Sequence, residues 1–312
     1  MKLSFKKVGF TLSFTEKVSF TLPPVFVLRS VIGSQLRRLC CVSHNSTCNE
    51  CMFSQSCAYG FAFESIVPKN NQVLMGRDRI SHPIILETEQ FSDVTADSLT
   101  IYMIFLGAAL KYLPYFYYAL KNSGKSGVLK ERVSFTIGDV RDGSRSLLID
   151  EDTLDTGFAP EVWEYEPEAS AAAMQKSLMV RITAPLRFKV DGRYTDRFSA
   201  GDFALCLHRR AQTLCSQYGV NDFPRNGGEG GSGEYRVSEG WDITERSLVW
   251  RDYTHYSARQ KQPLRLGGVT GTMVLSGEFS PYEYALLRFA EIFHAGKNTN
   301  FGLGKIDIWE KG

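Results

Sequence analysis

"PYEYALLRFAEIFHAGKNTNFGLGKIDIW", residues 281–309, gives the clearest indication of the fold. Its first part, "PYEYALLRFAEIF", predicts a helix, and "KIDIW" predicts a short strand, so "HAGKNTNFGLGK" is a glycine-rich connection between them. Glycine accepts positive φ and has no Cβ, so such a loop can bring backbone amides close to an anion. The segment predicts a helix–loop–strand unit whose loop faces a nucleotide, a nucleic-acid backbone, or no ligand.

The rest of the chain repeats one order of elements twice. In the second half, strands are predicted at 177–190, 246–257 and 267–279, and a helix at 202–219 that stops at a glycine. In the first half, strands are predicted at 8–20, 60–65, 82–90, 98–107 and 129–140, and helices at 27–41 and at 108–124, the latter ending at Gly124. Each half approximates β-α-β-β-α-β, which predicts an α+β protein of two tandem ferredoxin-like (RRM-like) domains.

The domain boundaries are predicted from a change in charge. Residues 150–168 contain eight acidic side chains and no Lys or Arg, and "EASAAAMQK" extends this stretch to 176. We expect an N-terminal domain at 1–149 with a cysteine-rich insertion at 40–57, an acidic linker at 150–176, and a C-terminal domain at 177–312. Outside the acidic stretch the chain is more basic than its net charge of +2, which fits a polyanionic partner or an ordinary solvated surface.

Composition limits the class of protein. With 43% hydrophobic and 22% charged residues, the chain of 312 residues is globular. It has no run of eighteen apolar residues and no signal peptide, so we expect no membrane partner and a cytoplasmic location. "NSGKSG", 122–127, lacks the first glycine of a phosphate loop because Ala119 stands there, so no nucleotide cofactor is expected.

Four cysteines lie close together in the sequence. Cys41, Cys48, Cys51 and Cys57 have the spacing C-x6-C-x2-C-x5-C. In a cytosolic chain this pattern indicates a structural zinc site more readily than disulfides, although free buried thiols fit equally well.

The histidines and aromatic residues allow two interpretations each. None of the five histidines has a partner at the spacing of a known catalytic motif, so each is a structural residue or a general acid or base. His44, near Arg37 and Arg38, is the best placed to act on a polyanion. "GFAF", 60–63, resembles the centre of the base-stacking signature of RRM domains, but Phe61 and Phe63 could equally be core residues.

Taken together, these stretches resemble one family. "GKNTNFGLG", 296–304, is similar to the G-x5-G-x-G loop that closes the RAMP proteins of CRISPR systems, and "FHAGKNTNFGLGKI" resembles the ending of Cas6 proteins. "WRDYTHYSARQKQPLRLGGVTG", 250–271, resembles a stretch of one Cas6 branch in which the position of His255 is usually Arg. "LRSVIGSQLRRLCCV", "CAYGFAFE", "APLRFKV" and "LHRRAQTLCSQYG" also fit this branch, in the correct order.

The resemblance implies an endoribonuclease that cuts CRISPR precursor RNA within its repeats without a metal ion. The ribose 2′-hydroxyl would attack the adjacent phosphate and leave a 2′,3′-cyclic phosphate and a 5′-hydroxyl. Such a reaction needs a proton acceptor, a proton donor and cations near the phosphorane. CRISPR repeat RNA and mature crRNA are the implied partners, with other CRISPR proteins as further candidates.

The resemblance also implies site residues. The family usually supplies a histidine soon after the first helix, the region of His44; His294, beside the glycine loop, and His255 are the second and third candidates for catalysis. The implied phosphate-binding residues are Arg37, Arg38, Arg259, Lys261, Gly296, Lys297, Gly302, Gly304 and Lys305.

Two other functions fit the same sequence. A non-catalytic RAMP subunit would have the same fold and loop and would bind guide RNA within an effector complex. A zinc-stabilised scaffold protein would use the loop as a plain turn and would bind no RNA.

Overall fold

The computed structural model describes residues 1–43, 47–67, 80–166, 172–220, 240–257 and 262–311. The chain packs as two compact units. The first unit is Ser4–Val162, and the second combines Met1–Leu3 with Trp163–Gly312. The predicted boundaries, 149 and 177, lie on either side of this division. The acidic stretch between them contains residues of three short strands: β6 (Leu148–Asp150), β7 (Thr153–Leu154) and β8 (Glu161–Glu164).

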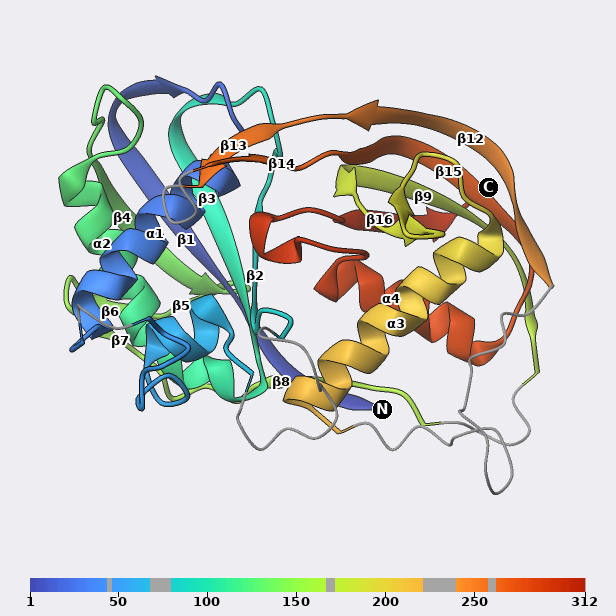
Figure 1. Cartoon of the computed structure of the whole chain (residues 1–312), viewed down its shortest axis with the longest axis horizontal. Helices are drawn as coiled ribbons and strands as arrows, with labels where there is room; N and C mark the ends of the chain where they lie inside the picture. Colours follow the sequence, from blue (N-terminus) through green and yellow to red (C-terminus); the bar gives the residue numbers. More distant parts are fainter. Residues whose placement is uncertain (44–46, 68–79, 167–171, 221–239, 258–261, 312) are drawn as a thin grey trace. The chain divides into compact units, whose positions relative to one another are not determined.

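The first unit has the ferredoxin-like order of elements (Figure 1). Its main elements are β1 (Lys2–Ser19), α1 (Pro24–Cys40), β2 (Ile84–Thr88), β3 (Thr95–Leu106), α2 (Leu113–Ser126), β4 (Phe135–Asp142) and β5 (Arg145–Ser146). The strands lie in the order β2-β3-β1-β4-β5, and the two helices pack against each other. Phe105 of β3 and Phe116 of α2 meet edge to face in the core, with ring centroids 5.6 Å apart.

The second unit repeats this arrangement (Figure 1). Its main elements are β9 (Met174–Leu186), α3 (Ala200–Tyr218), β12 (Trp241–Arg251), β15 (Gly268–Phe279), α4 (Pro281–Phe293) and β16 (Ile306–Glu310). The strands lie in the order β12-β15-β9-β16, with neighbouring strands antiparallel. Phe279, Phe289 and Phe293 are fully buried where α4 covers the sheet. The prediction of two tandem ferredoxin-like domains is confirmed.

Local sequence explains where α3 and α4 begin. Ser199 caps α3 in a reciprocal capping box with Asp202, and Ser280 caps α4 in the same way with Glu283. In each box the serine hydroxyl accepts a hydrogen bond from the backbone amide of the acidic residue. The carboxylate of that residue accepts one in return from the backbone amide of the serine, so two amides that would otherwise be unpaired have acceptors.

The prediction of a strand at 60–65 is wrong. Tyr59–Glu64 forms η1, one turn of π-helix. The hydroxyl of Tyr59 donates to Glu64 at 2.8 Å, and the ring of Phe63 lies so close to Gly33 of α1 that a Cβ there would come within 2.3 Å of it. Packing against α1 therefore overrides the strand-like alternation of "GFAF".

The predicted end of the second helix at Gly124 is also wrong. The helix begins with η2, a 3-10 segment at Gly107–Tyr112, and continues as α2 to Ser126, where Gly127, with φ 75°, ends it. Gly124 lies inside the helix. The residue is glycine because a Cβ there would come within 2.1 Å of the carbonyl oxygen of Phe135. This glycine permits close packing of the helix and β4 and is not a stop signal.

Two predicted long strands of the second unit are divided. β9 ends at Leu186, and a separate hairpin follows, made of β10 (Lys189–Val190) and β11 (Arg193–Tyr194). β12 ends at Arg251, and β13 (Thr254–Ser257) pairs with β14 (Gln262–Arg265) in a second hairpin. Among the described residues, no helix is both long and apolar enough to span a membrane.

Candidate functional site

The glycine-rich loop, residues 294–305, begins where α4 ends. The chain turns at His294, whose φ is 58°, and again at Gly296 and Gly304, with φ of 76° and 78°. A Cβ on Gly296 would lie 2.5 Å from the carbonyl oxygen of Arg187, and one on Gly304 only 1.9 Å from that of Ala295. Both glycines are therefore required by close backbone contacts as well as by positive φ.

The loop uses several of its amides to hold its own shape. The amide of Ala295 donates to Gly304 at 2.9 Å, that of Lys297 to Arg187 at 2.8 Å, and that of Gly304 to Pro185 at 3.0 Å. These bonds close the loop and attach it to the end of β9. Because the protein's own carbonyls already accept them, these three amides do not form an anion cradle.

Arg210 of α3 joins the loop to the end of α4. Its guanidinium donates to the carbonyls of Phe293 (3.0 Å) and His294 (3.3 Å) and to the hydroxyl of Thr299 (2.7 Å). Burial lowers the pKa of Arg210 to about 10, so the group stays charged at neutral pH. A buried cation at this position satisfies the last carbonyls of α4 and opposes the negative end of the helix dipole.

His294 is a structural part of the same network. Its side chain is fully buried, and Nδ1 lies 3.1 Å from the carbonyl oxygen of Leu303. Since a carbonyl oxygen can only accept, Nδ1 carries a proton and donates it. This histidine therefore braces the loop from inside, and no part of its ring reaches the surface.

His255 is also buried, with 8% of its surface exposed. It lies on β13, and its ring meets that of Phe301 edge to face at 5.7 Å, so two of the three predicted catalytic histidines lie against the glycine loop. The third, His44, lies outside the described residues.

The predicted phosphate-binding residues differ in exposure. In the second unit Lys297 is exposed, Gly296 and Lys305 are half-buried, and Gly302 and Gly304 are buried. In the first unit Arg37 and Arg38 are exposed in the last turn of α1. Arg259 and Lys261 lie outside the described residues.

The cysteine segment carries four half-buried thiols at the predicted zinc positions, Cys41, Cys48, Cys51 and Cys57. Over the ranges that the structure describes, no three His, Cys, Asp or Glu side chains come together in a group able to hold a metal ion. A hydrogen bond with the thiol of Cys40 lowers the pKa of Cys57 to about 6, although burial opposes this. The zinc site stays a prediction.

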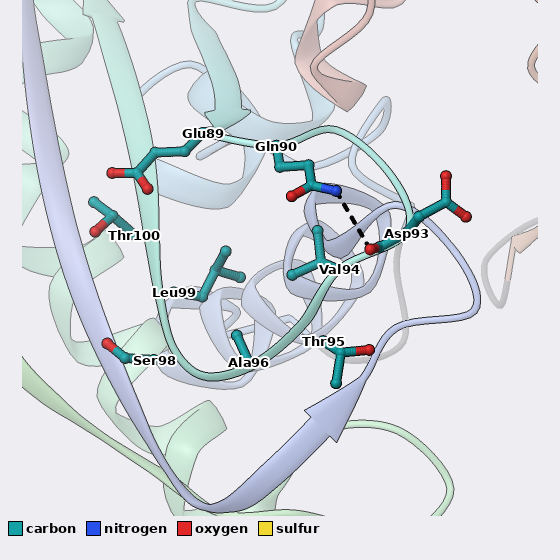
Figure 2. A pocket seen from close by; sticks show the side chains of 9 residues that line it. All are labelled: Glu89, Gln90, Asp93, Val94, Thr95, Ala96, Ser98, Leu99 and Thr100. Carbon is teal, nitrogen blue, oxygen red and sulfur yellow. Dashed lines mark hydrogen bonds between the residues drawn. The ribbon is translucent and has the colours of Figure 1, made fainter.

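A pocket of about 420 Å³ lies in the first unit, lined by the connection from β2 to β3 and by the first residues of β3 (Figure 2). Glu89 and Asp93 line it, and the side-chain amide of Gln90 donates across its rim to the backbone oxygen of Asp93 at 3.3 Å. None of the predicted site residues lines this pocket. The negative charges of Glu89 and Asp93 would repel a polyanion from this pocket.

Arg210 is the important residue that the sequence analysis did not identify. A signal for it exists, because Phe203, Leu207, Arg210 and Leu214 recur at the helical spacing and are all buried. An arginine on the apolar face of a helix predicts a buried cation with a specific task.

Comparison with known proteins supports the two-unit description. Residues 180–306 match the family described as the CRISPR-associated endoribonuclease Cas6, and residues 3–157 match the AF_1859_N N-terminal domain. No curated protein matches the sequence.

Solved structures share the fold at low sequence identity. Thermus thermophilus Cas6 is 15% identical, with a TM-score of 0.53 over 98% of this chain and 99% of its own. A chain of a partial Cas6-RT-Cas1–Cas2 complex is 12% identical, with a TM-score of 0.55 over 99% of this chain. The present chain spans 46% of that chain, and 29% of a related one from a Cas6-RT-Cas1–Cas2 complex.

The family match covers β15, α4 and the glycine loop, and it ends at the first residue of β16. The remaining elements follow the same two-unit fold as the solved Cas6 structures. Residues 180–306 therefore match the family of the CRISPR-associated endoribonuclease Cas6, and the chain as a whole shares the fold of solved Cas6 structures.

Proposed function

We propose that this protein cleaves CRISPR precursor RNA within its repeats by attack of a ribose 2′-hydroxyl on the adjacent phosphate. The new P–O bond forms a 2′,3′-cyclic phosphate, and the 5′-oxygen leaves with a proton as a 5′-hydroxyl. The observation that carries this proposal is the match of residues 180–306 to the Cas6 endoribonucleases.

The reaction requires proton transfer and charge stabilisation but no metal ion. We assign the proton transfer to His44, because His294 and His255 are buried against the glycine loop. Arg37 and Arg38 hold phosphates from α1, and Lys297 holds one from the loop, since all three are exposed. Arg259 and Lys261 remain candidates for the same task. Gly296, Gly302, Gly304 and Lys305 shape the loop that presents Lys297.

The partners follow from the same family assignment. One solved Cas6 structure of this fold is a product complex, and two others are parts of Cas6-RT-Cas1–Cas2 complexes. We therefore expect repeat RNA as the substrate, crRNA as the product, and other CRISPR proteins as occasional partners, all in the cytoplasm. A zinc ion on Cys41, Cys48, Cys51 and Cys57 would serve the stability of the first unit only.

A second candidate function is a non-catalytic RAMP subunit that binds crRNA. It is favoured by one observation: His208, His255 and His294 are buried and His82 is half-buried, so no described histidine is fully exposed to RNA. If His44 does not perform proton transfer, the fold would still bind RNA without cutting it.

The test is incubation of the protein, in EDTA, with labelled repeat RNA from an adjacent CRISPR array. The proposal predicts cleavage at one position, a 2′,3′-cyclic phosphate on the upstream fragment, and no cleavage of a repeat with a 2′-deoxy group at the scissile nucleotide. Tight binding without cleavage would support the non-catalytic subunit. Cleavage of the 2′-deoxy repeat would contradict the proposed mechanism.

A further inference from the structure

A short hairpin beside the glycine loop, here named the tyrosine hairpin (residues 187–194), has features that the proposed cleavage does not use. Lys189 pairs with Tyr194 and Val190 with Arg193. The turn between them is Asp191–Gly192, with φ of 49° and 77°. Positive φ at both turn positions is the mark of a type I′ turn, which matches the twist of the strands and makes a tight two-residue hairpin.

Two phenylalanines anchor the tyrosine hairpin in the core of the second unit. Phe188 and Phe198, 6% and 5% exposed, meet edge to face with ring centroids 5.1 Å apart. Phe198 also contacts Phe203 of α3, at 6.2 Å. Phe188 lies near the start of the hairpin and Phe198 follows its end, so the chain is fixed on both sides of the hairpin. Its side chains therefore lose little conformational entropy when a ligand binds.

The hairpin presents a partly exposed aromatic ring held by cations. Tyr194 is 37% exposed. The guanidinium carbon of Arg187 lies 3.6 Å from its ring centroid, and the ammonium of Lys189 lies 5.2 Å from it. Arg187 is itself fixed by a 2.8 Å hydrogen bond to the carbonyl of Gly267. The ring is thus ordered from one side by Arg187 while part of its surface stays in contact with solvent.

The surrounding charge is mainly positive and is not neutralised by ion pairs. None of Arg187, Lys189, Arg193 and Lys297 forms a salt bridge with a carboxylate in the described part of the chain. Asp191 is the acidic side chain of the hairpin, and Asp196 follows two residues after its end. The backbone amide of Lys297 donates to the backbone carbonyl of Arg187 at 2.8 Å, so the glycine loop contacts the hairpin directly.

An ordered aromatic ring among unpaired cations is suited to single-stranded nucleic acid, whose bases stack on aromatic rings while the phosphates meet Lys and Arg. We propose that the tyrosine hairpin binds an unpaired segment of the RNA, with one base stacked on Tyr194 and the flanking phosphates on Lys189, Arg193 and Lys297. This inference rests on the proposed function and adds to it a contact outside the cleavage chemistry.

The test measures binding of two labelled RNAs by fluorescence anisotropy, the CRISPR repeat and an unstructured twelve-nucleotide oligoadenylate. Tyr194→Ala should weaken binding of both by about 5- to 100-fold, while Tyr194→Phe, which keeps the stacking surface, should bind like the wild type. Tyr118→Ala in the first unit is the matched control, because Tyr118 is also 37% exposed. A cooperative thermal unfolding transition is required of each variant as the check that it is folded.

Salt dependence separates the phosphate contacts from stacking. The double variant Lys189→Gln and Arg193→Gln should lower the slope of log binding constant against log salt by about 1.4, at about 0.7 for each single-strand phosphate contact. Tyr194→Ala should leave that slope unchanged.

The outcomes distinguish this inference from the proposed function. If the wild type binds and cuts the repeat and Tyr194→Ala binds equally well, the hairpin proposal is wrong and the nuclease assignment stands. If the wild type binds oligoadenylate through Tyr194 but cuts no repeat, the hairpin is an RNA contact and the nuclease assignment fails. If polyglutamate displaces the RNA at equal charge concentration, the surface is a general polyanion site and the proposal is overturned.

Discussion

α1 and α3 are the first helices of two ferredoxin-like units, yet their arginines are used in opposite ways. In α1, Arg37 and Arg38 lie in the last turn and are exposed. In α3, Arg210 is buried and donates to two carbonyls at the end of α4 and to Thr299. The same helix of the same fold therefore offers charge to solvent in one unit and secures a loop in the other.

This comparison shows that basic residues in this protein cannot be assigned to RNA binding by type alone. The charge of Arg210 is directed at the protein's own backbone, whereas the charges of Arg37 and Arg38 are available to a ligand. Variants that separate these two uses should affect folding in one case and binding in the other.

The largest effect is expected for Arg210→Met. It would leave the carbonyls of Phe293 and His294 buried without a donor, which should lower the free energy of unfolding by about 3 kcal/mol. Urea denaturation measures this. Arg209→Met, at the exposed neighbouring position of α3, is the control and should change stability by less than about 0.5 kcal/mol. Equal stability of the two variants would show that the buried network does not stabilise the unit.

The second-largest loss of stability is expected for a substitution in the glycine loop. Gly304→Ala would combine a positive φ of 78° with a Cβ 1.9 Å from the oxygen of Ala295, and should destabilise by about 2–4 kcal/mol. Gly192→Ala is its matched control, because Gly192 has φ 77° but nothing within 4 Å of the added Cβ, so only the backbone cost of about 1 kcal/mol applies. Chemical denaturation of both variants compares them. A larger loss for Gly192→Ala would contradict the described packing of the loop.

The buried polar side of α3 also predicts a pH effect. His208 binds the hydroxyl of Tyr282 at 2.7 Å, and burial, with a smaller contribution from Arg209, lowers its pKa to about 4. The unfolded state, with an ordinary histidine pKa near 6.5, then binds the proton first as pH falls, so stability is lost between about pH 6.5 and pH 4. Between pH 7 and pH 5 the titration of this histidine should lower the free energy of unfolding by about 2 kcal/mol.

The variant His208→Phe isolates this contribution, because its titration is absent. The difference in unfolding free energy between pH 7 and pH 5 should be about 2 kcal/mol smaller in the variant than in the wild type. An identical pH dependence of the two proteins would show that burial does not lower the pKa of His208 in the folded state.

The smallest effect on stability is expected for Arg37→Ala and Arg38→Ala, which should stay within about 0.5 kcal/mol of the wild type. Their effect should appear instead in RNA binding, where the double variant should lower the salt slope by about 1.4. Filter binding of repeat RNA at several salt concentrations measures it. If the double variant were destabilised and its salt slope were unchanged, Arg37 and Arg38 would serve stability and not RNA binding, which would contradict the roles assigned to α1 and α3.

The parts of the fold that were predicted from sequence depend on local signals. The terminal Gly219 and the alternation of β1 act over a few residues, so the helix that ends at this glycine and the first strand could be anticipated. "GFAF" misled because its conformation depends on contact with Gly33, about thirty residues away.

The site was less predictable for the same reason. The glycine loop was found from its pattern, but the acceptors of its amides, Pro185 and Arg187, lie more than a hundred residues earlier in the chain. Nothing in the local sequence indicates that His294 turns inward. The tyrosine hairpin was merged into a longer strand, although "VDGR" contains the Asp-Gly pair that is typical of a tight hairpin.

The most direct test of the account is the single-turnover rate of repeat RNA cleavage by His44→Ala and His294→Ala, each checked for folding. We predict that His44→Ala binds the repeat normally but cuts it at least about 100-fold more slowly, as expected when a general acid or base is lost. His294→Ala should lose stability but should cut at a rate near that of the wild type at a temperature where it is folded. Full cleavage by His44→Ala, with a folded but inactive His294→Ala, would contradict the assignment and place the chemistry at the glycine loop.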